Sequence, residues 1–66
     1  MFIYKNIITI EPDKRSGKPC IRNMRITTDD ILRMLASDMS IEEIIEDFPE
    51  LTKKDILVTL EFTAQQ

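Results

Sequence analysis

The spacing of hydrophobic residues changes near residue 27, which divides the chain into a β segment and a helical segment. Residues 6–10 are rich in β-branched side chains, and Ile8 and Ile10 share one face at a period of two. We therefore predict a short strand over residues 6–10 that ends before Pro12.

A tight hairpin is predicted next. Cys20–Ile21 can pair with Arg25–Ile26, and Asn23 falls in the turn, where asparagine adopts a positive φ more easily than most residues do. Residues 1–26 are therefore expected to form a small β arm.

Three helix starts carry the same signal, a serine or threonine followed three residues later by an aspartate or glutamate. The three pairs are Thr27 with Asp30, Ser40 with Glu43, and Thr52 with Asp55. In such a capping box the hydroxyl accepts a hydrogen bond from the third amide of the helix, and the acid accepts one from the amide of the capping residue. Each box precedes an amphipathic run, so we predict helices over residues 28–37, 41–47 and 53–64.

The third helix has hydrophobic residues on two sides. Its predicted core stripe comprises Ile56, Leu57, Leu60 and Ala64. Away from that stripe, Val58 and Phe62 are four residues apart and project to the other side of the helix. A helix that is apolar on two sides is usually buried on two sides, so Val58 and Phe62 are candidates for a partner or dimer interface. The alternative cover is the β arm, through Phe2, Ile3 or Tyr4.

Together these elements predict a mainly α fold in a single domain over residues 1–66. The β arm of residues 1–26 precedes a three-helix bundle over residues 27–66, whose second and third helices form a helix-turn-helix. A chain of 66 residues can build only a thin core, so we expect a homodimer.

The composition excludes most catalytic chemistry. The chain has no His, no Trp, one Gly and one Cys, so it lacks the residues for a glycine-rich phosphate loop, a zinc site or a Cys-His nucleophile. We therefore expect no enzyme activity, no catalytic residue, no metal, no cofactor and no small-molecule substrate. The single Cys20 and the lack of a membrane-length apolar run or a signal-peptide pattern predict a cytoplasmic protein without a membrane partner.

The two segments differ in charge. Residues 1–26 carry six cations and two anions, a net charge of +4, whereas residues 27–66 carry three cations and ten anions, a net charge of −7. Such a division predicts two surfaces with different partners. The alternative is that the two ends attract each other within the fold or across a dimer.

Several sequence blocks resemble the prokaryotic domain-of-unknown-function family 433 (DUF433), over about residues 7–64. They are Gly17 through Arg22, Arg25 through Thr27, Asp30 through Leu32, Met39–Ser40, Glu43–Ile44, Phe48–Pro49, Leu51–Thr52 and Asp55–Ile56. The resemblance implies a homeodomain-like helix-turn-helix preceded by a β hairpin. DUF433 is grouped with VapB-type antitoxins, so it also implies the antitoxin of a type II toxin–antitoxin system, which binds and inhibits a PIN-like ribonuclease toxin and binds its own operator DNA.

Two positions depart from the family pattern. Asn23 stands where the family usually has glycine in the hairpin turn, and Asp38 stands where it usually has glycine after the first helix. Both residues can enter the left-handed region of φ and ψ, though less readily than glycine. We therefore expect that neither departure changes the fold.

Five basic residues are candidates for binding DNA. Three lie in or just before the predicted hairpin and two at the start of the third helix, where a helix-turn-helix presents side chains to the major groove. They are Lys18, Arg22, Arg25, Lys53 and Lys54. The alternatives are that Arg22 or Arg25 pairs with the acidic helices, and that Glu50 and Asp55 neutralise the two lysines.

The second helix offers an acidic surface made of Glu42, Glu43, Glu46 and Asp47. These carboxylates would repel DNA but would complement the electropositive cleft of a ribonuclease, so they are candidates for the toxin interface. A second class of function stays open: a protein-interaction adaptor with a helix-turn-helix shape and no DNA binding.

Overall fold

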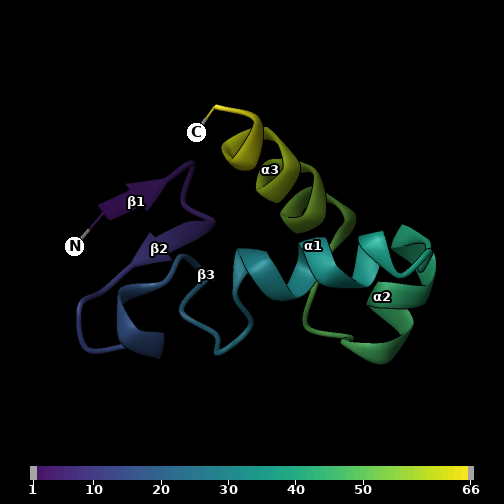
Figure 1. The fold of residues 1–66 in the computed structure, drawn as a ribbon, viewed down its shortest axis with the longest axis horizontal. Helices are drawn as coiled ribbons and strands as arrows, with labels where there is room; N and C mark the ends of the chain where they lie inside the picture. The colour runs from purple at the N-terminus through teal and green to yellow at the C-terminus, as the bar shows by residue number, and fades with distance from the viewer. Residues whose placement is uncertain (1, 66) are drawn as a thin grey trace.

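A computed structural model of the chain describes residues 2–65. Within these residues it contains three strands, a short 3-10 helix and three α-helices (Figure 1). In chain order they are β1 (Phe2–Tyr4), β2 (Ile8–Ile10), η1 (Arg15–Gly17), β3 (Cys20–Ile21), α1 (Thr28–Ala36), α2 (Ile41–Asp47) and α3 (Lys53–Ala64). None of the helices in this part of the chain is long and apolar enough to span a bilayer.

The three helices begin at the predicted capping boxes. Thr27, Ser40 and Thr52 each accept a hydrogen bond from the third amide of their helix through the side-chain oxygen, at 3.0–3.1 Å. The acids at those third positions accept from the capping amides at 2.8–3.0 Å. The boxes satisfy amides that would otherwise lack partners, so the helix boundaries predicted from sequence are confirmed to within one residue.

The β segment is larger than predicted, because it forms a three-stranded antiparallel sheet in the order β1-β2-β3. The sequence prediction missed β1 and started β2 two residues early. Lys5 and Asn6 have φ values of 51° and 59° and form a tight turn closed by the amide of Ile7 donating to the carbonyl oxygen of Tyr4 at 3.0 Å. Two successive positive φ values are the signature of a type I′ turn, which matches the twist of a hairpin.

The predicted hairpin is present and uses a second turn of the same kind. Arg22 and Asn23 have φ values of 40° and 65°, and the amide of Met24 donates to the carbonyl oxygen of Ile21 at 2.7 Å. Cys20 bridges to Thr27, so the returning strand lies one residue later than predicted. The expectation that Asn23 and Asp38 can enter the left-handed region is confirmed, since Asp38 also has a positive φ, of 71°.

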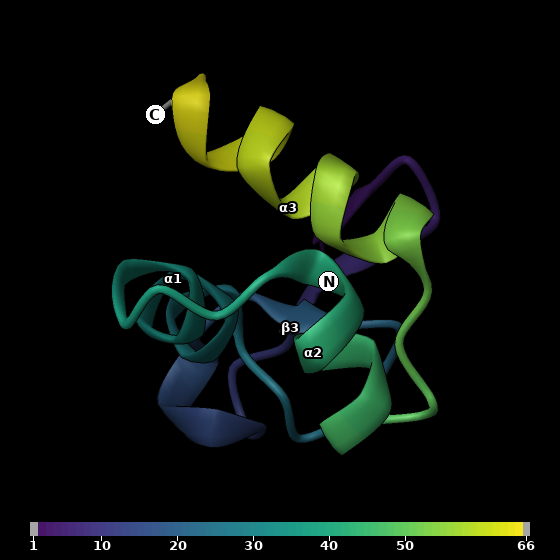
Figure 2. The same cartoon turned by 90° about the vertical axis from the view of Figure 1, so that its right-hand side faces the viewer.

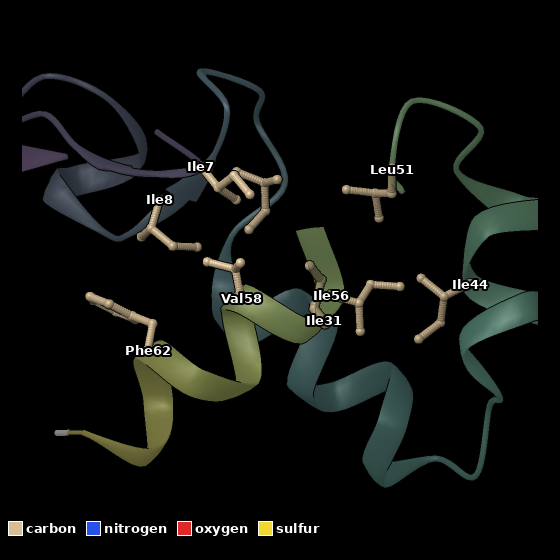
Figure 3. Close-up of a cluster of buried hydrophobic side chains, with 9 residues drawn as sticks. Ile7, Ile8, Ile31, Ile44, Leu51, Ile56, Val58 and Phe62 are labelled. Carbon is tan, nitrogen blue, oxygen red and sulfur yellow. The ribbon is translucent and has the colours of Figure 1, made fainter. Parts of the chain in front are cut away.

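One hydrophobic core joins the sheet to all three helices (Figure 3). Ile8 and Ile21 come from the sheet, and Ile31, Ile44 and Ile56 come from α1, α2 and α3; all five are completely buried. The predicted β arm is therefore a sheet that contributes to the core. Since α3 contacts β2 as well as α1 and α2, it is the helix that links the two halves of the molecule.

The predicted orientation of α3 is right for Ile56, which is buried, and wrong for the rest of the predicted stripe. Val58 and Phe62, assigned to a partner interface, are 8% and 5% exposed and belong to the core. Their cover is the sheet: the ring of Phe62 lies 5.3 Å from that of Tyr4 and 6.4 Å from that of Phe2, measured between centroids. The alternative cover by the β segment is therefore the one observed.

The supposed core leucines of α3 face outward instead. Leu57 and Leu60 are 48% and 38% exposed, and Ala64 is also exposed. The inward side of the helix contains Asp55 and Thr59, both buried, so its polar residues concealed the true core face from the hydrophobic pattern.

Candidate nucleic-acid and protein interfaces

Four cations are assembled at one end of the molecule by contacts between η1 and the β3 hairpin. Lys14 donates to the carbonyl oxygen of Asn23 and, at 2.8 Å, to its Oδ1. Arg15 donates to the carbonyl oxygen of Arg25. The amide of Lys18 donates to the carbonyl oxygen of Arg15 at 3.1 Å.

These contacts hold two basic segments side by side. We call the resulting surface the hairpin cluster and define it by Lys14, Arg15, Lys18 and Arg25. Its only ion pair within residues 2–65 joins Arg15 to Asp30 at 3.9 Å, the outer limit for such a contact. Lys18 and Arg25 were predicted from the sequence as DNA-binding candidates, whereas Lys14 and Arg15 were not, although their position in the basic segment just before Gly17 was a signal.

Arg22, a third hairpin candidate, is turned away from this cluster. Its Nε donates to both carboxylate oxygens of Asp55, at 3.1 and 3.2 Å, and its Nη2 lies 2.8 Å from Oδ2. Nη2 also donates to the carbonyl oxygen of Glu50. The hydrogen bonds to Asp55 raise the pKa of Arg22 above its ordinary value. The guanidinium therefore fastens the hairpin to the start of α3, which is the alternative to DNA contact that the sequence left open.

Lys53 and Lys54 are exposed in the first turn of α3. Neither forms an ion pair with another residue between 2 and 65, and the carboxylate of Asp55 is taken by Arg22 and by the amide of Thr52. The alternative, that Glu50 and Asp55 neutralise the lysines through ion pairs, is therefore not observed in the described part of the chain. Beyond this first turn the outward side of α3 presents Leu57 and Leu60, which cannot hydrogen-bond to base edges.

The acidic residues of α2 lie far from the hairpin cluster. In Figure 1, η1 (blue) is near the left end of the long axis and α2 is at the right end. Glu42, Glu43, Glu46 and Asp47 are all exposed, and none of them forms an ion pair within the described part of the chain. One oxygen of Glu43 is committed to the capping box, where it accepts from the amide of Ser40.

A cavity of about 240 Å³ lies between α1 and the end of α2. It is lined by Ile26, Asp30, Arg33, Met34 and Phe48. Its volume is below the roughly 300–1,000 Å³ of most small-molecule sites, so its size suits a single side chain of a binding partner better than a cofactor. Within residues 2–65, no three Asp, Glu or Cys side chains are grouped as a metal site requires.

Comparison with known proteins gives a family and a fold. A family model described as "Protein of unknown function (DUF433)" matches residues 8–63. The crystal structure of a DUF433 member protein from Anabaena variabilis is similar over 94% of this chain, with a TM-score of 0.89 and 26% sequence identity. This chain spans 61% of the length of that chain. The comparison with curated proteins gave no match.

Proposed function

The chain belongs to the DUF433 family, and we propose that it is the antitoxin of a type II toxin–antitoxin pair. In this proposal α2 binds a PIN-like ribonuclease, and the hairpin cluster binds phosphates of the operator DNA. The homeodomain-like helix-turn-helix of α2 and α3 belongs to the same proposal.

The observation that carries the proposal is the separation of charge along the molecule. The hairpin cluster lies near one end, and four exposed carboxylates of α2 without ion pairs lie at the other (Figure 1). At the hairpin end, two carboxylates of residues 11–13 line the same hollow as Lys14 and Arg25, so cations are in excess there but not alone. An excess of opposite charge at the two ends suits one anionic and one cationic partner. DNA is such an anionic partner, and the RNA-binding cleft of a ribonuclease is such a cationic one.

DNA binding is assigned to the hairpin cluster because of its geometry. Its cations belong to two segments that hydrogen bonds hold together, so little ordering is required when they meet a phosphate backbone. Each phosphate neutralised by a cation contributes about −0.9 to the slope of log K against log salt concentration. Four cations therefore give a slope of up to about −4 per chain.

The test is fluorescence anisotropy with a duplex that carries the sequence upstream of the gene, measured over a series of salt concentrations. Lys18→Ala with Arg25→Ala should weaken binding and make the salt slope shallower by about 2. The matched control, Lys5→Ala with Arg33→Ala, removes the same charge outside the cluster and should leave the slope near its original value. If both pairs act equally, the cluster is not the DNA site.

Ribonuclease binding is tested with the nuclease encoded beside this gene. Glu42→Lys with Glu46→Lys should slow association and reduce its salt dependence, since electrostatic steering acts mainly on the association rate. Glu11→Lys with Asp13→Lys makes the same change of charge outside α2 and serves as the control. Inhibition of RNA cleavage that is indifferent to the α2 substitutions would reject this surface as the toxin interface.

A second candidate, a protein-interaction adaptor without DNA binding, is favoured by the outward side of α3. A recognition helix needs donors and acceptors along that side, and here Leu57 and Leu60 occupy it. The salt series separates the two candidates, because an adaptor would show no DNA binding at any salt concentration.

A further inference from the structure

The outward side of α3 leaves two large hydrophobic side chains uncovered. Leu57 and Leu60 are 48% and 38% exposed, and both are conspicuous because α3 buries two polar residues on its other side. Figures 1 and 2 place α3 along the top of the molecule in two perpendicular views, with α1, α2 and β3 beneath it. We call this surface the outer face of α3.

The outer face of α3 has a defined pattern. At about 100° per residue, Lys53, Leu57, Leu60 and Ala64 fall within an arc of about 60°. Lys54 and Glu61 lie together on one flank of that arc, about 80–100° from Lys53. A stripe of two leucines is thus bordered on one flank by a cation near the helix start and an anion near its end.

We propose that two copies of this chain associate through the outer faces of their α3 helices, antiparallel about a two-fold axis. A two-fold contact uses the same patch on both copies, so the patch must complement itself. With the axis midway between Leu57 and Leu60, Leu57 of one copy meets Leu60 of the other. The same two-fold axis places the charged flanks of both helices on one side of the contact. Lys54 of each copy therefore faces Glu61 of the other, and the two residues are offset by about one helical turn or less along the helix axis.

The charged groups that this arrangement needs are available. Lys54 forms no ion pair within residues 2–65. Glu61 is bound through Oε1 to the ammonium of Lys5 and to the hydroxyl of Tyr4, at 2.5 and 3.1 Å, whereas Oε2 has no ion-pair partner in the described part of the chain. Lys5 and Tyr4 also hold the Glu61 side chain in place, which reduces the entropy lost when a second cation binds.

The size of the patch sets the expected strength. One face of a 12-residue helix is about 18 Å long, which provides less than the roughly 800 Å² per partner of a standard interface. A permanent dimer is therefore not expected. The association should be an equilibrium of low affinity that depends on protein concentration. The proposal is independent of whether the protein binds DNA or a ribonuclease.

Sedimentation equilibrium of the full chain between about 10 µM and 1 mM tests the proposal. The unmodified chain should shift from monomer toward dimer, and Leu60→Asp should weaken the dimer by about tenfold or more. Ile3→Asp is the matched control, because Ile3 is 50% exposed on the sheet and lies outside α3. Circular dichroism of each variant verifies that the fold is kept, which is expected because both positions are exposed.

A charge exchange tests the antiparallel register. Lys54→Glu alone and Glu61→Lys alone should each weaken the dimer by about threefold or more, since each places like charges opposite one another twice per dimer. The double variant should restore most of that loss. A monomer at all concentrations, a dimer unaffected by Leu60→Asp, or a charge exchange that restores nothing would each overturn the proposal.

Discussion

The two sides of α3 are both partly apolar, and they differ in what satisfies their polar groups. The buried side contains Asp55 and Thr59 beside its three hydrophobic core residues, and the outer face contains two leucines. Burial here follows the availability of partners. The Asp55 carboxylate has hydrogen bonds from Arg22 and the Thr52 amide, and the Thr59 hydroxyl donates to the carbonyl oxygen of Asp55 at 2.8 Å.

This difference between the two sides of α3 indicates the condition under which a polar residue can occupy a core position while an apolar residue stays exposed. Burying a polar group without a hydrogen bond costs roughly 1–3 kcal/mol on the scale of protein mutants, and a satisfied group avoids most of that cost. An exposed leucine forgoes part of its transfer free energy but incurs no such penalty. The contacts of Asp55 with Arg22 and the Thr52 amide, which we call the polar clamp, can therefore help to orient a helix that is apolar on two sides.

Substitutions at Phe62 and Leu60 test the comparison of the two sides of α3, and they have the largest expected effect on the free energy of unfolding. Phe62→Ala should lower the free energy of unfolding by about 3–5 kcal/mol, because it empties a buried position beneath Tyr4. Leu60→Ala should change the stability of the monomer by less than about 0.5 kcal/mol. Urea denaturation at low protein concentration measures both.

A chain of this size could lose its fold with Phe62→Ala, so Phe62→Leu is the milder variant, with an expected loss of about 1–1.5 kcal/mol. Equal losses at Phe62 and Leu60 would contradict the assigned orientation of α3.

The polar clamp itself gives the second prediction. Asp55→Asn keeps the shape of the side chain but removes the charge that binds Arg22, and the expected loss is about 1–2 kcal/mol. The value is modest because the Arg22 side chain is 41% exposed and can regain water. Asp47→Asn, a matched change at an exposed position, should alter stability by less than about 0.5 kcal/mol. Chemical denaturation measures both variants. Equal losses in the free energy of unfolding would contradict a stabilising role for the contact between Asp55 and Arg22.

Local signals in the sequence were sufficient to locate most secondary structure. Each capping box involves residues only three positions apart, so Thr27, Ser40 and Thr52 identify their helices without tertiary information. Asn23 likewise marked a turn that requires positive φ. The strand β1 was missed because three residues next to the terminus give little periodic signal, and pairing with β2 is what makes them a strand.

The orientation of α3 could not be predicted from local signals. The division of the cations between the hairpin cluster and the contact with α3 could not be predicted from them either. The pair Arg22–Asp55 spans 33 positions, and nothing local distinguishes Arg22, which is fastened to α3, from Arg25, which is not. The contacts that bring Lys14 and Arg15 to the hairpin are also tertiary. The charge of the two segments was therefore predictable, but the membership of the hairpin cluster was not.

Thr59 supplies the third prediction, which asks whether a polar residue is needed on the buried side. Thr59→Val keeps the branched shape and removes a hydroxyl whose acceptor, the carbonyl oxygen of Asp55, is also accessible to the helix ladder. The lost hydrogen bond and the gained apolar burial nearly cancel, so stability should change by less than about 1 kcal/mol in either direction. Thermal unfolding measures the change. A loss above about 2 kcal/mol would mean that this hydroxyl orients α3 together with Asp55.

The smallest predicted effect concerns Glu61, at the edge of the outer face of α3. Its hydrogen bond with Lys5, followed by that with Tyr4, lowers the pKa of the Glu61 carboxyl below its ordinary value of 4.5. A group whose pKa is lower in the folded state stabilises the fold above its unfolded pKa and loses that contribution as the pH falls through its folded pKa. Glu61→Gln should therefore cost a small amount of stability at pH 7 and nothing at a pH well below 4.5. A difference between the two proteins that persists in acid would contradict this linkage.

The titration of Glu61 also separates contacts within one chain from contacts between two. The carboxyl carbon chemical shift of Glu61, followed by NMR, should have its midpoint below 4.5 even in dilute protein, because Lys5 and Tyr4 belong to the same chain. If Lys54 of a second copy also binds this carboxylate, the midpoint should fall further as the protein concentration rises, since a nearby cation favours the charged form. Lys54→Ala should abolish the concentration dependence and leave the dilute midpoint unchanged, whereas Lys5→Ala should raise the dilute midpoint. A midpoint at or above 4.5 in dilute protein would mean that the contact between Lys5 and Glu61 does not form in solution. A midpoint that does not depend on protein concentration would contradict the proposed contact between Lys54 and Glu61 of two copies.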